Sequence, residues 1–147
     1  MIRVQREDFD VGAEMAALAR GRTGIGGIAS FVGLVRDTDG IRAMTLEHYP
    51  GMTERALEAI EREACERWPL EATLIVHRYG RLTPGERIVL VVTAASHRAA
   101  AFEACAFLVD WLKTKAPFWK LEETAQGERW VEAKASDDDA AKRWVAE

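Results

Sequence analysis

Pairs of predicted strands that lie between predicted helices set the fold class of this 147-residue chain. Alternation of apolar and polar side chains predicts strands, and apolar residues at three- and four-residue spacing predict helices. The predicted strands cover residues 2–5, 28–35, 43–48, 72–79, 87–95, 118–124 and 129–133, and the predicted helices cover residues 11–20, 53–68, 98–116 and a last segment after Ser136. Because strands come in pairs between helices, we expect an α+β fold with a mixed, mainly antiparallel sheet and packed helices.

Glycine and proline mark several boundaries between these elements. Pro117 ends the third predicted helix, because the residue before a proline disfavours the helical conformation. Residues 80–86 contain a Pro-Gly pair and are predicted to form a turn. The glycine-rich residues 24–27 precede a strand instead of joining a strand to a helix. They therefore predict a close approach of backbone segments, and not a nucleotide-binding loop.

The length and charge of the chain narrow its class. A chain of 147 residues is most simply one domain, residues 1–147, which can bury roughly 70% of its unfolded surface. It carries 20 basic and 24 acidic side chains, so we expect no overall attraction to nucleic acid or to an anionic membrane. The N-terminus has no apolar signal segment, and no apolar run is long enough to span a membrane. These features predict a cytoplasmic protein.

The longest predicted helix carries a lysine where its pattern calls for an apolar residue. The residues of its predicted core stripe are Phe102, Cys105, Ala106 and Val109. At about 100° per residue, Lys113 falls in the middle of this stripe and Lys115 falls on the opposite face. Lys113 either lays its methylenes on the core and extends its ammonium to solvent, or it is a functional amine. Helical geometry leaves both interpretations open, and Lys120 follows seven residues later, past Pro117.

A candidate anion site lies at the predicted start of the same helix. His97 and Arg98 combine an imidazole, a guanidinium and free backbone N–H groups, which together suit a phosphate or a carboxylate. Arg36, which follows the glycine-rich strand, could contribute to the same anion site. In the alternative interpretation, which stays open, these side chains face solvent and bind no anion. His77-Arg78 is a second such pair, better explained as hydrogen-bonded residues at the end of a strand.

We expect neither a bound metal nor a cofactor. The acidic run at residues 137–139 is explained by the first turn of a helix, where the helix dipole favours negative charge. Cys65 and Cys105 are far apart and have no histidine at metal-ligand spacing. We predict that both are packing residues with free thiols, which suits a reducing compartment.

Several runs of residues, taken in order along the chain, resemble one protein family. They are Gly26-Gly27-Ile28-Ala29-Ser30-Phe31-Val32-Gly33-Leu34-Val35-Arg36-Asp37, Leu46-Glu47-His48-Tyr49 with Met52, His77-Arg78-Tyr79-Gly80, His97-Arg98 with Ala101-Phe102, Leu112-Lys113, Pro117-Phe118-Trp119-Lys120, Gly127 and Trp130-Val131. Each run is a weak signal alone, but together they cover nearly the whole chain. In this order they resemble the large, catalytic subunit of molybdopterin synthase.

The resemblance implies an enzyme, a sulfurtransferase of molybdenum cofactor biosynthesis. Such enzymes convert cyclic pyranopterin monophosphate to molybdopterin, and they take both dithiolene sulfurs from the C-terminal thiocarboxylate of a small ubiquitin-like subunit. The resemblance also implies a fold of the α/β-hammerhead type. It further implies a homodimer of large subunits with one small subunit at each end, which makes a heterotetramer.

The resemblance also implies the residues of an active site. Lys113 and Lys120 match the two active-site lysines of the family, near the incoming thiocarboxylate. The residues that match its substrate pocket are Phe31, Arg36, His97 and Arg98. Lys134 aligns with a position where some members have arginine, and a lysine there contacts a phosphate only as a point charge. We expect Lys113 to be the main acid/base or electrostatic residue, and Lys120 to position the thiocarboxylate, because ammonium groups stabilise developing oxyanions.

Two other functions agree with the residues alone. A desolvated Lys113 is also the nucleophile that an enzyme forming a Schiff base with a small carbonyl substrate needs. A non-catalytic module that binds a phosphorylated metabolite would use His97, Arg98 and Arg36, and its lysines would be dispensable.

Overall fold

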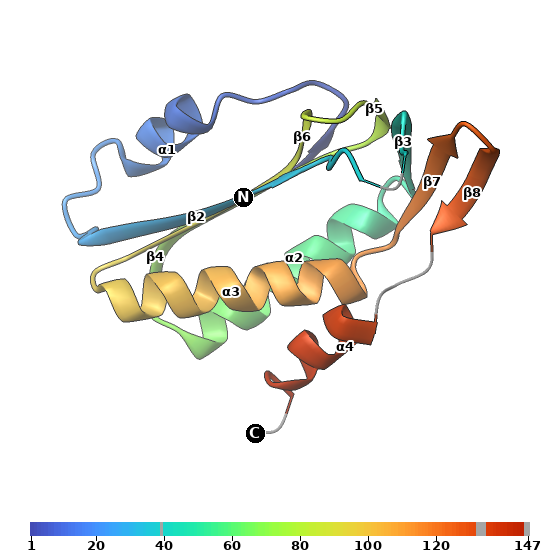
Figure 1. Cartoon of the computed structure of the whole chain (residues 1–147). Helices are drawn as coiled ribbons and strands as arrows, with labels where there is room; N and C mark the ends of the chain where they lie inside the picture. The colour runs from blue at the N-terminus through green and yellow to red at the C-terminus, as the bar shows by residue number, and fades with distance from the viewer. Residues whose placement is uncertain (39, 132–134, 146–147) are drawn as a thin grey trace.

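Strands and helices follow one another in nearly the predicted order (Figure 1). The computed structural model describes residues 1–38, 40–131 and 135–145. The strands are β1 (Ile2–Gln5), β2 (Gly27–Leu34), β3 (Ala43–His48), β4 (Leu70–Arg78), β5 (Gly80–Leu82), β6 (Arg87–Ala95), β7 (Phe118–Thr124) and β8 (Gly127–Val131). The helices are α1 (Val11–Ala19), α2 (Met52–Arg67), α3 (Arg98–Lys115) and α4 (Ala135–Lys142). Every predicted element is present, and the described bounds are shifted by only a residue or two, whereas residues 132 and 133 of the last predicted strand lie outside the described residues.

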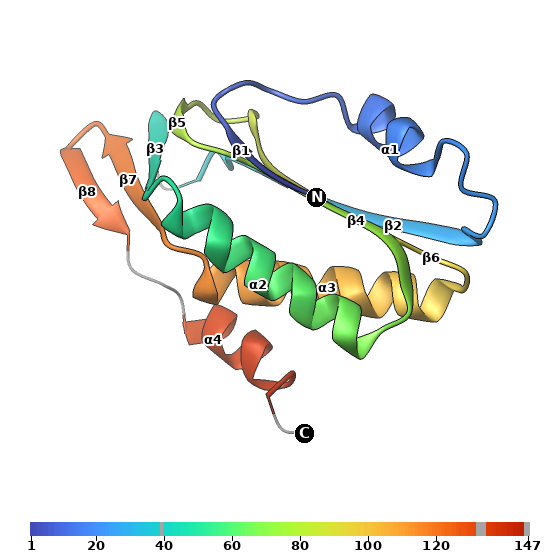
Figure 2. The ribbon, with the colours of Figure 1, turned by 180° about the vertical axis from the view of Figure 1, so that it is seen from behind.

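The first sheet carries most of the hydrophobic core. Its strand order is β1-β4-β6-β2, with β1 parallel to β4 and the other neighbours antiparallel. Helices α2 and α3 cover one face, and α1 covers the other (Figure 1, Figure 2). Along β6, Val89 and Val91 pack toward α2 and α3, whereas Leu90 and Val92 pack toward α1. Both faces of β6 are covered, which agrees with the continuous apolar run at its centre, residues 88–92.

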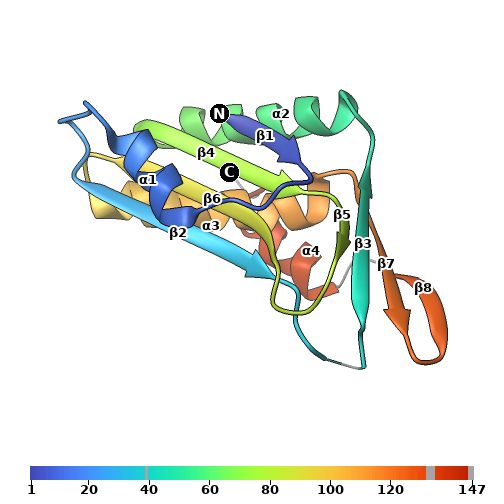
Figure 3. The same cartoon turned by 90° about the horizontal axis from the view of Figure 1, so that it is seen from above.

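A second sheet lies across one end of the first (Figure 3). Its strand order is β5-β3-β7-β8, and every neighbouring pair is antiparallel. The sequence did not predict β5, because residues 80–86 were expected to form a turn only. This strand is three residues long and places Arg81 opposite Thr45 of β3. So short a segment has no readable alternation. The predicted α+β class, with mainly antiparallel sheets, is confirmed.

The apolar stripe predicted for the core side of α3 lies at the edge of the core and not at its centre. Cys105 belongs to the core and Val109 packs against it, whereas Phe102 lies outside it. The buried residues of α3 are Ala101, Ala104, Cys105, Phe107, Leu108 and Leu112. Their centre lies roughly 120° around the helix from Phe102, which is 65% exposed. Ala106, Val109 and Lys113 line cavities beside β2 instead. The prediction that Lys113 lies on the core stripe was therefore wrong, because that stripe is the cavity-facing flank of the helix.

Two glycines allow the close backbone approach that the glycine-rich segment predicted. A Cβ atom on Gly26 would lie 2.0 Å from the backbone oxygen of Ser96, in the turn between β6 and α3. A Cβ atom on Gly33 would lie 2.8 Å from Val89 and 3.4 Å from the ring of Phe31. The first glycine therefore lets β2 begin against the start of α3, and the second leaves room for the Phe31 ring.

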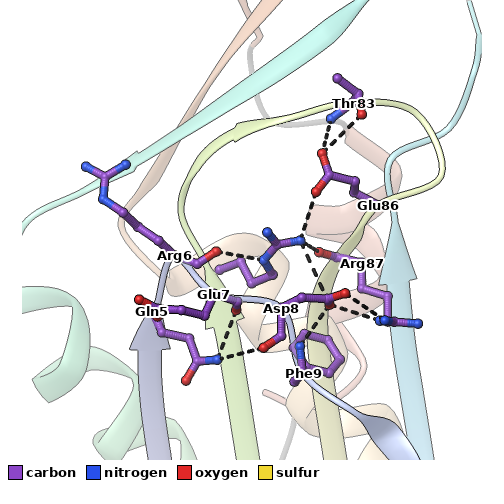
Figure 4. A network of polar contacts seen from close by, with 9 residues as sticks. Gln5, Arg6, Glu7, Asp8, Phe9, Thr83, Glu86 and Arg87 are labelled. Carbon is purple, nitrogen blue, oxygen red and sulfur yellow. Dashed lines mark hydrogen bonds and ion pairs between the residues drawn. The ribbon is translucent and has the colours of Figure 1, made fainter.

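A polar network ties the N-terminal segment to the turn before β6 (Figure 4). Arg78, buried at the end of β4, donates to the backbone oxygen of Arg6 (2.9 Å), to the Glu86 carboxylate (3.3 Å) and to the backbone oxygen of Arg87 (3.0 Å). The Arg87 guanidinium donates two hydrogen bonds to Asp8 and holds the pKa of that carboxyl below its usual value. The prediction that Arg78 is a hydrogen-bonded residue at a strand end is confirmed.

Candidate active site

An apolar cavity of about 110 Å³ lies where the last turns of α3 meet β2, β6 and the start of β7. Its apolar side chains belong to Phe31, Leu34, Ile88, Val89, Val91, Val109, Leu112, Ala116 and Phe118. The other described side chains on its wall belong to His77, Lys113 and Lys120. This cavity, called the slot below, is therefore a narrow apolar space that two amines and one imidazole enter.

A wider cavity of about 450 Å³ adjoins the slot and shares Lys113 and Lys120 with it. Its other charged lining residues are Arg36, Glu122 and Arg129. The Arg129 guanidinium pairs with the Glu122 carboxylate at 3.0 Å. Among the described residues four cations thus meet one carboxylate, an excess that favours an anion such as phosphate. The volume suits a small molecule.

A short join between a helix and a strand brings the two lysines together. Lys113 lies in the last turn of α3, and β7 begins at Phe118, directly after Pro117. The backbone N–H of Phe118 donates to the carbonyl oxygen of Ala116 at 2.9 Å. Because the chain passes from helix to strand without a loop, Lys113 from α3 and Lys120 from β7 line the same two cavities.

His77 is a residue of the slot that the sequence indicated only as one of two hydrogen-bonded residues at the end of a strand. It is 6% exposed, and its ring stacks on that of Phe118 with the centroids 3.7 Å apart. Its Nδ1 donates a hydrogen bond to the carbonyl oxygen of Arg78 at 2.8 Å. Burial lowers the pKa of His77 to about 4 although this carbonyl opposes the change, and the charges of Lys120 and Lys113 lower it further. The ring is therefore neutral at neutral pH.

The remaining predicted pocket residues fall into three places. Phe31 lines the slot, and Arg36 lines the wider cavity with the two lysines. Lys134 lies outside the described residues. His97 and Arg98 lie at the opposite end of α3, where both are exposed and the His97 side chain makes no capping hydrogen bond.

The expectation that Arg36 can join His97 and Arg98 was wrong for a single chain. A Cβ atom on Gly27, at the first residue of β2, would lie 3.6 Å from the Cα of Arg98, whereas Arg36 lies two residues past the last residue of that strand. The 15 positions from Arg98 to Lys113 span roughly 22 Å of helix. The predicted anion site and the lysine site are therefore two separate regions of one chain.

The residues that the sequence missed carried weak signals. His77 was recognised only as half of a pair, although a histidine within an apolar strand can also mark a polar group that faces a cavity. Glu122 and Arg129 lie opposite each other on β7 and β8, a pairing that requires the register of the hairpin. Phe118 follows the proline that ends the predicted helix, and no pattern in the sequence indicated that its ring would stack on another ring.

Comparison with known proteins shows the family to which the chain belongs. The family described as MoaE protein matches residues 4–115. The chain belongs to the MoaE family. A molybdopterin synthase catalytic subunit from Pseudomonas aeruginosa is 58% identical over 146 residues, which cover 97% of this chain and 97% of the relative. Another, from Mesorhizobium japonicum, is 56% identical and covers 97% of this chain and 92% of the relative.

Solved structures extend the MoaE assignment to the fold. A MoaE protein from Burkholderia ambifaria superimposes with a TM-score of 0.87 at 56% identity, over 100% of this chain and 99% of the other. A complex of subunits 1 and 2 of molybdopterin-converting factor from Helicobacter pylori has a chain that superimposes with a TM-score of 0.73. At 19% identity, over 90% of this chain and 91% of that one, this likeness concerns the fold alone.

The relatives bear on the predicted family, the predicted enzyme class and the predicted function. The predicted family, the enzyme class and the function in molybdenum cofactor biosynthesis are confirmed through the relatives of the MoaE family. Each helix in the described part of the chain is too short or too polar to cross a membrane.

Proposed function

We propose that this MoaE-family chain converts cyclic pyranopterin monophosphate to molybdopterin, with sulfur from the C-terminal thiocarboxylate of a small ubiquitin-like subunit. The observation that carries the proposal is the wall that the two cavities share, where Lys113 and Lys120 enter both. The narrow slot suits an extended, glycine-ended tail, and the cationic cavity suits a phosphorylated pterin. The two reactants then meet at a pair of amines.

The two lysines have different places in this proposal. Sulfur transfer brings an anionic thiocarboxylate against an electrophilic carbon, with proton transfer as an oxygen departs. Lys120 positions the thiocarboxylate, because it lies two residues after Phe118 on the same side of β7 and reaches into the slot. Lys113 is the acid/base or electrostatic residue at the boundary with the wider cavity, where a charged donor stabilises a developing oxyanion.

The pterin has its own binding residues in this proposal. Arg36 binds the phosphate, because a guanidinium binds phosphate through two parallel hydrogen bonds and this one lines the wider cavity. Phe31 packs on the reactants from the slot. Lys134 contributes as a point charge.

The proposed sulfur carrier is supported by the fold likeness to the Helicobacter pylori protein, whose structure is a complex of two subunits. The tail of the carrier must present its last atoms to Lys120 while the rest of the carrier stays outside. A slot of about 110 Å³ holds only a few residues of extended chain, so the body of the carrier docks on the surface around it.

We further propose that two copies of this chain form a homodimer, with one small subunit on each, as a heterotetramer in the cytoplasm. Roughly 22 Å of helix separates Arg98 from Lys113, too far for one small pterin to contact both within a chain. His97 and Arg98 of a second copy resolve this separation if they face the wider cavity of the first. The free thiols of Cys65 and Cys105 agree with a reducing compartment, and residues 1–147 act as one domain.

A reconstituted reaction tests the proposed function. The protein is mixed with cyclic pyranopterin monophosphate and a thiocarboxylated small subunit, and the dithiolene product is measured by mass spectrometry. The matched control contains the same small subunit with an ordinary C-terminal carboxylate, and it should give no product. Absence of product with the thiocarboxylate, while both reactants bind, would refute the proposal.

A further inference from the structure

The imidazole of His77, which lines the slot, carries a hydrogen-bond acceptor. A carbonyl oxygen only accepts hydrogen bonds, so the contact of 2.8 Å with the Arg78 carbonyl requires the proton of the imidazole to be on Nδ1. In a neutral ring the other nitrogen, Nε2, then carries a lone pair. The ring lines the same cavity as the two lysines. The slot therefore contains one neutral nitrogen acceptor among the described side chains that line it.

The orientation of this ring is fixed on several sides. One face stacks on Phe118, with 15° between the ring planes. The Nδ1 hydrogen bond reaches the carbonyl of Arg78, and the Arg78 side chain is itself fixed by Arg6, Glu86 and Arg87 (Figure 4). A flip of the imidazole would break the bond to Arg78, so the tautomer and the position of Nε2 are set together.

The charges around the ring keep this acceptor available. The ionisable groups that act on His77 are Lys113 of α3, Lys120 of β7 and His48 of β3, and each opposes its protonation. Burial opposes protonation most strongly and places the pKa of His77 at about 4. At neutral pH the ring therefore neither gains a proton nor adds to the positive charge of the slot.

A lysine ammonium that lines the same slot can donate to this acceptor. The group has three N–H donors and no acceptor, so one donor can bond to the imidazole while the others make further contacts. Lys120 follows Phe118 by two residues, so it lies on the same side of β7 as the ring on which His77 stacks. Of the two amines, Lys120 also has the larger electrostatic effect on His77.

We propose that His77 is a positioning residue, whose Nε2 accepts a hydrogen bond from the Lys120 ammonium inside the slot. The bond fixes the direction in which Lys120 presents its remaining N–H donors. Because the bond uses one N–H of the ammonium, the other N–H groups of Lys120 can make further contacts. The consequence for a thiocarboxylate rests on the proposed function, whereas the hydrogen bond itself does not.

Amine reactivity tests this proposal without any turnover. The intact protein is treated with trace acetic anhydride at pH 8, and acylation of Lys120 is measured by mass spectrometry relative to the exposed Lys115. In His77→Asn the amide N–H replaces Nδ1–H, but no atom replaces Nε2. In His77→Gln the side-chain oxygen reaches the Nε2 position. We expect Lys120 to react about tenfold faster in the Asn variant, because loss of the acceptor favours the neutral amine.

The Gln variant and the unmodified protein provide the controls. Lys120 should react in His77→Gln within about twofold of its rate in the unmodified protein, because an acceptor remains. Equal Lys120 reactivity in the Asn, Gln and unmodified proteins overturns the proposal. If the Asn variant does not fold, ¹⁵N NMR of the unmodified protein decides, since a proton on Nε2 at pH 7 overturns it as well. A failure of the proposed function would be seen separately. In that case the reconstituted reaction would give no dithiolene product, although Lys120 still reacted faster in the Asn variant.

Discussion

The two ends of α3 differ in how much of a site each forms within one chain. At the C-terminal end, Lys113 meets Lys120 on the wall of two cavities, next to the buried ring of His77. At the N-terminal end, His97 and Arg98 are exposed, and the His97 side chain caps nothing. One end has cavities beside its charges, whereas the charges at the other end lie on the exposed surface.

The charged residues at the two ends of α3 are therefore stabilised in different ways. The cations at the C-terminal end complement the helix dipole and also line cavities. Arg98 at the N-terminal end opposes that dipole, and no described acidic residue lies in the first turn to offset it. An anion or another molecule would therefore stabilise the N-terminal end more than the C-terminal end.

The largest effect is expected for the amines at the C-terminal end. Lys113→Ala and Lys120→Ala should each lower sulfur transfer by roughly 10²- to 10³-fold, the usual loss for a donor that stabilises a developing oxyanion. Lys115→Ala is the matched control, because Lys115 stacks over Trp111 outside both cavities. Rates of product formation are compared for variants that still bind the small subunit. Near-normal turnover in either variant would show that the substituted lysine is not an active-site residue.

The buried histidine at the same end should make stability depend on pH. The unfolded chain binds a proton on His77 near pH 6.5, and the folded chain binds it only near pH 4. The free energy of unfolding should therefore fall as the pH falls below about 6.5, and this loss should end below about 4. A difference of about 2.5 pKa units corresponds to roughly 3 kcal/mol.

Urea unfolding at a series of pH values between 7 and 5 measures this slope. The slope should become clearly shallower in His77→Gln. His97→Gln, at the exposed end, is the control for removing a histidine elsewhere. An unchanged slope in His77→Gln would mean that His77 takes up its proton over the same pH range in the folded and in the unfolded chain. Asp8 and Glu86, whose pKa values are lowered, lose their contributions at more acidic pH.

An intermediate effect is expected at the N-terminal end of α3. Arg98→Ala should lower turnover roughly 10- to 100-fold, since a hydrogen bond to a charged group contributes about 1.5–3 kcal/mol. If Arg98 acts on the cavity of the second copy, a mixture of Arg98→Ala and Lys113→Ala subunits contains dimers with one intact site. Random pairing with exchange should then restore about one quarter of full activity.

Subunit mixing thus separates action across the dimer from action within one chain. The control is a mixture of Lys113→Ala with Lys120→Ala subunits. These two residues line the same cavities of one chain, so their mixed dimers contain no intact site. If the Arg98 mixture stays as inactive as this control, Arg98 does not act on the site of the second copy.

The smallest effect concerns the backbone beside His97. Gly26→Ala should lower the free energy of unfolding by roughly 1–3 kcal/mol, because its Cβ would meet the backbone oxygen of Ser96 at 2.0 Å. Gly24→Ala is the control, since its Cβ would meet only the end of the flexible Glu71 side chain. Both values come from urea unfolding. Equal stability of the two variants would contradict the close approach at the start of α3.

The sequence predicted the fold well because local patterns determine most of it. Strands such as β6 are continuous apolar runs, and Pro117 marks the end of α3 in sequence and structure alike. It missed β5 because three residues carry no readable period. It also misjudged the flank of α3, because helical angles alone do not distinguish an apolar side that packs in the core from one that lines a cavity.

The site was predictable in part, for a related reason. Lys113 stood out because it interrupts an apolar flank, and its pairing with Lys120 followed from the resemblance and is present in the geometry. The distance between Arg36 and Arg98 was misjudged, because the direction of β2 relative to α3 is a property of the assembled sheet. His77 was missed because its role depends on a tautomer that only the position of the Arg78 carbonyl determines.

Under the proposed function, in which two sulfurs are delivered in turn, the wall between the slot and the wider cavity has a consequence for the order of events. A carrier tail that enters through the apolar side can withdraw after its sulfur is delivered, while a pterin on the cationic side keeps its own contacts. Exchange of the donor then does not require release of the half-finished intermediate. Among the charged residues described, only Lys113 and Lys120 line both cavities. The carrier tail and the pterin would therefore come into contact only at these two lysines.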